Sequence, residues 1–146
     1  MLAAVALALA CAIGALGCSG YSAEEQLVRS ERAAEAWAAL ASEVPGTVDL
    51  VTAFGITEEL DEWGNALPVL ELDGAKTKLI VDLVDVYNAT ADEAQRLSMT
   101  DALEVFEHLP DVLAEPEGAG YAFLVWAVSP SSADSSQSNV AAIAAV

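Results

Sequence analysis

The stretch "KTKLIVDLVDVY" (76–87) decides the fold, because two rules of sequence reading disagree about it. Its valine and isoleucine residues favour a β-strand. Its polar residues favour a helix, since at about 100° per residue Lys78, Asp82 and Asp85 share one narrow face. A strand would place Asp82 and Asp85 on opposite faces of an otherwise apolar ribbon. The periodicity therefore predicts a helix over residues 76–87.

A second helix is expected near the N-terminal end of the polar part of the chain. Ser22 and Glu25 match the S-x-x-E capping box that begins many helices. A stripe of apolar residues that includes Trp37 then recurs at helical spacing. The pair Pro45-Gly46 is a typical stop signal. We therefore expect a helix from Ser22 to the residues just before Pro45.

Between these two helices the sequence favours short strands. "TVDLVTAFGI" (47–56) is rich in β-branched and aromatic residues and predicts a strand, with a helix as the alternative. "TEELDEWGN" (57–65) indicates a short acidic turn of helix or a loop. "LPVLELDG" (67–74) alternates apolar and polar residues and ends on Asp73-Gly74, a turn signal, so it predicts a short strand.

Two more helices are expected after residue 90. Thr90 and Glu93 form a second capping box in front of "ADEAQRLS". Thr100 is the expected cap of "DALEVFEHL" (101–109), whose apolar residues again lie on one face. Pro110 is expected to interrupt that helix, because proline cannot donate the backbone hydrogen bond that a helix interior needs.

The C-terminal part of the sequence indicates one more strand and a tail. "YAFLVWAVS" (121–129) is too short to cross a bilayer and predicts a buried strand. "SSADSSQS" (131–138) has the low complexity of a mobile linker. The last residues, "NVAAIAAV" (139–146), are expected to form a frayed helix or an extra strand.

Together these segments predict a small single α+β domain, with helices packed on a few short strands after an N-terminal apolar leader. A mostly helical domain is the alternative architecture. The expected boundaries are a globular acidic domain at 22–130 and a Ser-rich tail at 131–146.

The charge of the chain limits its partners. The sequence has 23 acidic residues against five basic ones, which gives a net charge of −18, and it repels nucleic acid phosphates. Residues 43–73 contain eight acidic residues and no basic one. This stretch predicts a negative surface that attracts a basic protein, or a surface that serves only solubility or adaptation to salt.

The first residues form an apolar leader. Residues 2–18 are only Ala, Leu, Val, Ile, Gly and Cys, and the run is shorter than the roughly 20 residues of a membrane span. Such a run is typical of the central part of a secretory signal peptide. An uncleaved single-span anchor, in a protein of bacterial or phage origin, is the alternative.

The end of this leader, Ala15-Leu16-Gly17-Cys18, resembles the lipobox of bacterial lipoprotein precursors. The resemblance implies a signal peptide at 1–17, cleavage before Cys18, and acylation of Cys18 with palmitate or similar chains. Several acyl chains hold a protein stably on a membrane. Residues 18–21 would then be the lipidated tether, and the domain would lie in the cell envelope, facing the periplasm or the outside. A second lipobox-like stretch ends at Cys11.

Few residues suggest chemistry. Glu104 and His108 lie four apart on one helical face, but a zinc site needs three or four ligands. Asp82 and Asp85 could act as a carboxylate pair, yet such pairs are inevitable in so acidic a chain. "EELDEWGN" (58–65) and "ELDG" (71–74) lack the ligand spacing of an EF-hand. The sequence therefore predicts a non-catalytic binding or structural domain with no metal and no cofactor.

Overall fold

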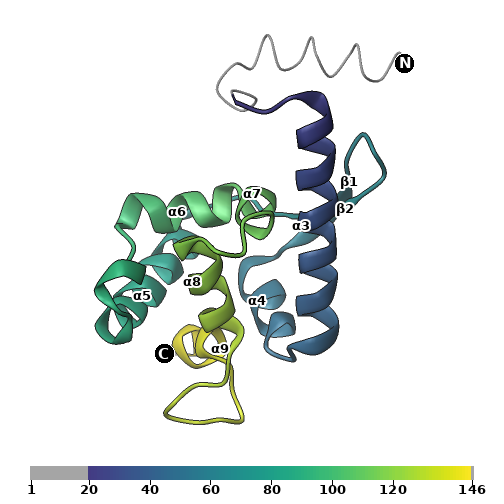
Figure 1. The fold of residues 1–146 in the computed structure, drawn as a ribbon. Helices are drawn as coiled ribbons and strands as arrows, with labels where there is room; N and C mark the ends of the chain where they lie inside the picture. The colour runs from purple at the N-terminus through teal and green to yellow at the C-terminus, as the bar shows by residue number, and fades with distance from the viewer. Residues whose placement is uncertain (1–19, 146) are drawn as a thin grey trace.

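Helix α3 (Ala23–Glu43) opens the part of the chain that the computed structural model describes, residues 20–145 (Figure 1). Its cap is Ser22, whose hydroxyl oxygen accepts a hydrogen bond of 3.1 Å from the backbone N–H of Glu25. The helix ends at Glu43, directly before Val44 and Pro45. The predicted first helix is therefore confirmed at both ends.

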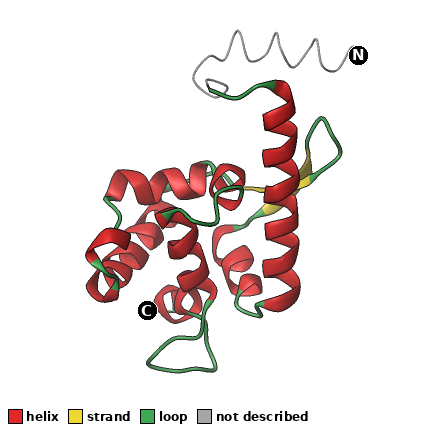
Figure 2. Ribbon diagram, viewed as in Figure 1, coloured by secondary structure: helices red, strands yellow, loops and turns green. Residues whose placement is uncertain are grey.

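After α3 the chain continues through short elements that are mostly helical (Figure 2). In order they are α4 (Thr47–Phe54), β1 (Thr57–Leu60), β2 (Ala66–Val69), α5 (Gly74–Thr90), the 3-10 turn η1 (Glu93–Gln95), α6 (Met99–Glu107), α7 (Leu109–Leu113), α8 (Ala119–Val128) and α9 (Asn139–Ala144). Strands β1 and β2 form a two-stranded antiparallel sheet. The chain is thus a small α+β domain, as the sequence predicts, in which helices predominate.

The segment that decides the fold is helical, and α5 confirms the argument from periodicity. Its buried residues follow the helical repeat: Ile80, Leu83, Val84 and Tyr87. Asp85 is exposed, and Asp82 accepts a hydrogen bond of 2.9 Å from the Lys78 ammonium group one turn earlier. Helical spacing of polar residues therefore outweighs the β-propensity of valine and isoleucine in this stretch.

The two strands predicted at 47–56 and 121–129 are wrong, since both segments are helices. In α4, Leu50 and Phe54 are four residues apart and both are buried, and Gly55 ends the helix in the left-handed conformation at φ 62°. Helix α8 is apolar on all sides, and this pattern fits a fully buried helix as well as a buried strand. Packing among the other helices decides between the two.

Two predicted caps are also wrong. Thr90 is the last residue of α5 rather than a cap, and only the short turn η1 follows it. Helix α6 begins two residues earlier than expected, because the hydroxyl of Ser98, not that of Thr100, accepts the backbone N–H of Asp101. The expected break at Pro110 is present, but the proline also lies in the first turn of α7, where its missing N–H costs nothing.

The region between α4 and α5 contains the hairpin. The strand predicted at 67–74 is present in shorter form as β2, and Asp73 instead caps α5 by accepting the backbone N–H of Lys76 at 2.9 Å. Residues 57–60, expected in a turn of helix or a loop, form β1. Every residue of β1 is exposed, so no burial pattern could mark this strand in the sequence.

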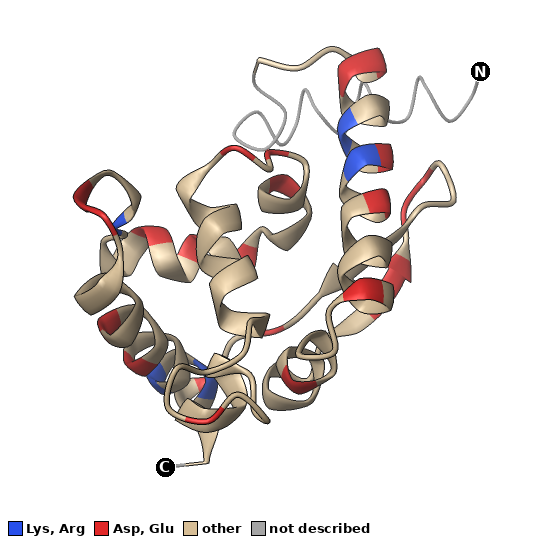
Figure 3. Cartoon of the chain, turned by 60° about the horizontal axis from the view of Figure 1, so that its bottom comes forward, with Lys and Arg blue, Asp and Glu red and all other residues tan. Residues whose placement is uncertain are grey.

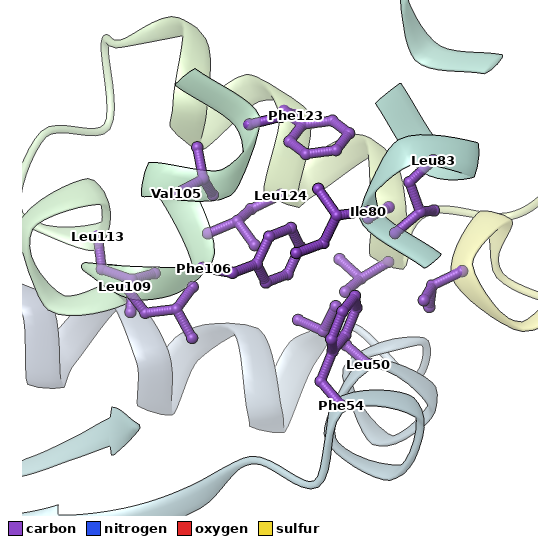
Figure 4. Close-up of a cluster of buried hydrophobic side chains, with 14 of the residues drawn as sticks. Leu50, Phe54, Ile80, Leu83, Val105, Phe106, Leu109, Leu113, Phe123 and Leu124 are labelled. Atoms are coloured by element: carbon purple, nitrogen blue, oxygen red, sulfur yellow. The ribbon is translucent and has the colours of Figure 1, made fainter. Parts of the chain in front are cut away.

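The core lies where α4, α6 and α8 meet, and aromatic rings fill its centre (Figure 4). The rings of Phe54 and Phe106 stack with centroids 4.4 Å apart, and Phe123 meets Phe106 edge to face at 6.0 Å. All three side chains are at most 1% exposed. Aromatic pairs of this kind contribute about 0.5–1.5 kcal/mol each beyond the area that they bury.

The Ser-rich segment is not a tail separate from the domain. Pro130 and Ser138 form a β-bridge at the base of the exposed loop 132–137, and Ser138 then caps α9. Helix α9 packs against α4, α5 and α8, and Val140 is completely buried. The boundary expected after residue 130 is therefore corrected: the domain continues through α9.

Candidate binding surface on the acidic hairpin

The hairpin is a strand pair closed by a loop that its own side chains stabilise. One carboxylate oxygen of Asp61 accepts the backbone N–H groups of Trp63 at 3.0 Å and of Asn65 at 2.9 Å. Gly64 has a φ of 81°, the left-handed conformation that a three-residue hairpin loop requires at its end. Within the acidic run 57–65, Asp61, Gly64 and Asn65 therefore serve to form the turn of the hairpin.

Polar contacts attach this hairpin to α3. The buried hydroxyl of Ser30 donates to the second carboxylate oxygen of Asp61, and the Asn65 amide donates to the Ser30 oxygen at 3.1 Å. About two turns further along α3, the indole N–H of Trp37 donates to the Glu58 carboxylate at 2.9 Å. Two acids of the hairpin, Asp61 and Glu58, are therefore used to hold it in place.

The other two acids of the hairpin face solvent. Glu59 and Glu62 are exposed, and in residues 20–145 neither side chain forms a hydrogen bond or an ion pair. Basic residues lie elsewhere, chiefly on α3 and α5 (Figure 3). The hairpin therefore presents uncompensated negative charge, and it lies within the stretch 43–73 in which the sequence predicted a negative surface.

A pocket of about 220 Å³ lies beside the hairpin, between α3, the hairpin loop and α7. The basic residue that lines this pocket, Arg29, already forms ion pairs within the domain. Its guanidinium group lies 2.9 Å from the carboxylate of Glu115 and 3.7 Å from that of Asp111. The guanidinium group also lies over the ring of Tyr21, at 4.3 Å from the centroid. These contacts attach the first half of α3 to α7 and to the residues that follow α7, and they balance the charge of Arg29.

The acids and the histidine that suggested chemistry do not form one site. Glu104 and His108 are exposed and border a shallow pocket of about 290 Å³, but no side-chain contact joins them. His108 is the residue at which α6 ends and α7 begins. Asp82 is paired with Lys78 on α5. Within residues 20–145, no group of three or more histidine, cysteine, aspartate or glutamate side chains is placed to hold a metal ion.

A further pocket of about 560 Å³, which was not predicted from the sequence, lies between α8 and the end of the domain. Tyr121, Val125 and Trp126 line it, together with Pro130 and Asn139. Since 121–129 was expected to be a strand, the residues that share this face of α8 could not be recognised. Helical periodicity applied to the same segment would place Tyr121, Val125 and Ser129 along one side.

The predicted lipidation site, Cys18, lies outside the described residues, as do Cys11 and the signal peptide expected at 1–17. In residues 20–145, no helix has the length and apolarity to cross a membrane. Comparisons of the chain with protein-family models, with curated proteins and with solved structures found no match.

Proposed function

We propose that this protein is a cell-envelope lipoprotein, acylated at Cys18, whose α+β domain is a non-catalytic binding module. The sequence Ala15-Leu16-Gly17-Cys18 supports the anchor, and the distance between the start of the domain and its acidic hairpin is compatible with it. Ser30 and Trp37, which hold the hairpin, lie 7 and 14 residues beyond the start of α3. At about 1.5 Å per residue, this places the hairpin roughly 10–20 Å along the helix from the tether.

This distance matters for a domain held close to a bilayer. The screening length at physiological salt is about 8 Å, so charges further from anionic headgroups interact with them only weakly. If α3 is directed away from the bilayer, a hairpin displaced along this helix can carry uncompensated negative charge without strong repulsion by the headgroups. It remains available to a soluble partner or to one embedded in the same membrane.

Mass spectrometry of the mature N-terminus tests the anchor. We expect cleavage before Cys18 and an acylated Cys18, and we expect a Cys18→Ala protein to be uncleaved or released from membranes. Cys11→Ala is the matched control, because this residue would leave with the signal peptide. An intact Met1, or an unmodified N-terminus elsewhere, would exclude the lipoprotein and favour an uncleaved anchor or secretion.

A second candidate function is the capture of a basic protein, as an inhibitor or an immunity-type protein would do. Exposed Glu59 and Glu62, which have no partner in residues 20–145, favour it. We expect wild-type domain to retain a basic protein from envelope extracts at low salt and to lose it at about 0.5 M salt, where screening is strong. The double variant Glu59→Gln/Glu62→Gln should retain much less. Equal retention by both proteins would show that these charges serve only solubility.

A further inference from the structure

We propose that β1 binds an extended basic segment of a partner protein as a third strand of the hairpin sheet. This inference rests on the second proposed function, the capture of a basic protein, and it specifies how that protein would be held. In this mode of recognition, main-chain hydrogen bonds supply affinity and alternate side chains supply specificity.

The register of the hairpin shows which backbone groups of β1 point outward. The pairs are Thr57 with Val69, Glu58 with Pro68, Glu59 with Leu67 and Leu60 with Ala66. At the loop, the N–H of Asp61 donates to the carbonyl of Asn65 at 3.0 Å. Because antiparallel pairs alternate between bonded and non-bonded, Glu59 and Thr57 bond to β2. Glu58 and Leu60 therefore direct their N–H and C=O groups away from β2.

Pro68 supports this assignment independently. Proline has no N–H to donate, so in β2 it fits only at a position whose backbone forms no hydrogen bond with β1. Its partner Glu58 must then also be at a non-bonded position. Pro68 also closes the other edge of the sheet, since it is buried and β2 packs against α3 and α7. The hairpin thus has one closed edge and one open edge.

The open edge is accessible along its whole length. Every residue of β1 is exposed, and Leu60 is 73% exposed. In residues 20–145, no backbone hydrogen bond joins Glu58 or Leu60 to another element. The hairpin also projects from the side of α3, away from the helical core (Figure 1). An unpaired strand edge of this kind is a template for another strand.

The charge of the hairpin determines which kind of strand can pair with the open edge of β1. Pairing β1 with β1 of a second copy would bring the acids of one hairpin against those of the other, and like charges on facing strands are destabilising. A basic segment would instead complement Glu59 and Glu62, which are exposed and have no partner within residues 20–145. Exposed Leu60 adds an apolar contact, so the segment expected is one in which basic and apolar residues alternate.

Two synthetic probes of equal length and charge are used: the lysine–valine peptide, in which the two residues alternate, and the methylated peptide, which has the same sequence with every backbone nitrogen N-methylated. Only the first can form a ladder, because N-methylation removes every backbone N–H donor. We expect the lysine–valine peptide to bind at low salt and to slow hydrogen exchange of the Glu58 and Leu60 amides. The amides of Thr57 and Glu59, which already bond to β2, should change little.

Variants at one position separate the backbone from the side chain. Leu60→Pro removes the outward N–H without changing any charge and without removing a bond to β2, and Leu60→Ala keeps the N–H. We expect affinity for the lysine–valine peptide to fall about tenfold in Leu60→Pro, and less in Leu60→Ala. Protection of the Asp61 amide shows that the hairpin of Leu60→Pro is still folded. If it is not, amide exchange in the wild-type domain decides the question.

Each remaining outcome contradicts a different statement. Equal binding of both peptides, or binding unchanged by Leu60→Pro and weakened by Glu59→Gln/Glu62→Gln, would overturn strand addition but keep the capture of a basic protein. No binding of either peptide, with no effect of Glu59→Gln/Glu62→Gln on retention, would overturn both. A dimer of the free domain that Leu60→Pro dissociates would assign the edge to a second copy.

Discussion

The aromatic cluster at the centre of the helices and the hairpin beside α3 differ in what holds them in place. Phe54, Phe106 and Phe123 are at most 1% exposed, and the rings of Phe54 and Phe123 both contact that of Phe106, so removal of apolar surface from water stabilises them. The hairpin exposes all of β1, and it is attached through the hydrogen bonds of Ser30 and Trp37 and through the packing of β2 against α3 and α7. A surface held in this way can change its side chains without loss of the core.

The largest effect is expected from opening the core. Phe106→Ala removes a ring that stacks on Phe54 and meets Phe123, and large-to-small changes of this kind cost about 3–5 kcal/mol. Urea denaturation measures the free energy of unfolding. Leu60→Ala, at an apolar residue of the hairpin that is 73% exposed, is the control and should stay within about 0.5 kcal/mol of wild type. Similar losses of unfolding free energy in both variants would contradict the distinction between the buried core and the exposed hairpin.

A large effect is also expected at Gly46, between α3 and α4. A Cβ atom there would collide with the backbone carbonyl of Val128 and lie 2.8 Å from the Cβ of Ser138. Gly46→Ala should therefore destabilise the domain by about 1–3 kcal/mol, the usual cost of overpacking. Gly74→Ala is the matched control in thermal unfolding, because a Cβ at Gly74 meets nothing within 4 Å. A neutral Gly46→Ala would show that α8 is not packed against this corner.

A smaller and local effect is expected where the hairpin meets α3. Ser30→Ala removes the donor to Asp61 and the acceptor of Asn65, at an expected cost of about 1–2 kcal/mol. Hydrogen exchange should become faster at the Asp61 amide and stay unchanged in α6 and α8. Ser42→Ala is the control, since the Ser42 hydroxyl contacts only the nearby carbonyl of Ala39. Faster exchange throughout the core would mean that the hairpin and the helices unfold together.

A smaller loss of stability is expected from a substitution at Gly64 in the hairpin loop. Gly64 has a φ of 81° and nothing within 4 Å of a Cβ, so Gly64→Ala tests conformational strain alone. An L-residue in this region costs about 1 kcal/mol or slightly more. Urea denaturation should show this loss, whereas Gly74→Ala in the first turn of α5 should be neutral or stabilising. Equal changes in the free energy of unfolding for Gly64→Ala and Gly74→Ala would contradict the left-handed conformation of Gly64.

The smallest effect at neutral pH concerns Tyr87, which is packed against Phe123 and Trp126. Burial, and to a lesser degree the charge of Asp92, raises the pKa of its hydroxyl above 10.0. Above that pH the unfolded chain loses a proton that the folded chain keeps, so stability should fall as pH rises through this range. Tyr87→Phe should reduce this dependence in urea denaturation at alkaline pH. An unchanged pH profile would contradict the assignment to Tyr87.

Local signals in the sequence determined the parts of the fold that need no distant partner. The Ser22 cap, the stop at Pro45 and the helical repeat of α5 each depend on residues within one or two turns, and all three are confirmed. The class of the domain, α+β, also follows from the sequence. The negative stretch 43–73 marks the region of the candidate surface, because net charge does not depend on how the chain folds.

Tertiary structure alone decided the rest. Segments 47–56 and 121–129 are apolar enough for either a strand or a helix, and only burial among α5, α6 and α9 selects α4 and α8. In the sequence Gly46 is a helix stop signal. In the structure, its lack of a side chain allows the backbone carbonyl of Val128, 82 residues further along the chain, to approach closely. The open edge of β1 also depends on pairing: β1 is exposed throughout, and its outward N–H groups are defined only by the register with β2. Contacts between distant residues cannot be read from local propensity, because the same local pattern is compatible with more than one partner.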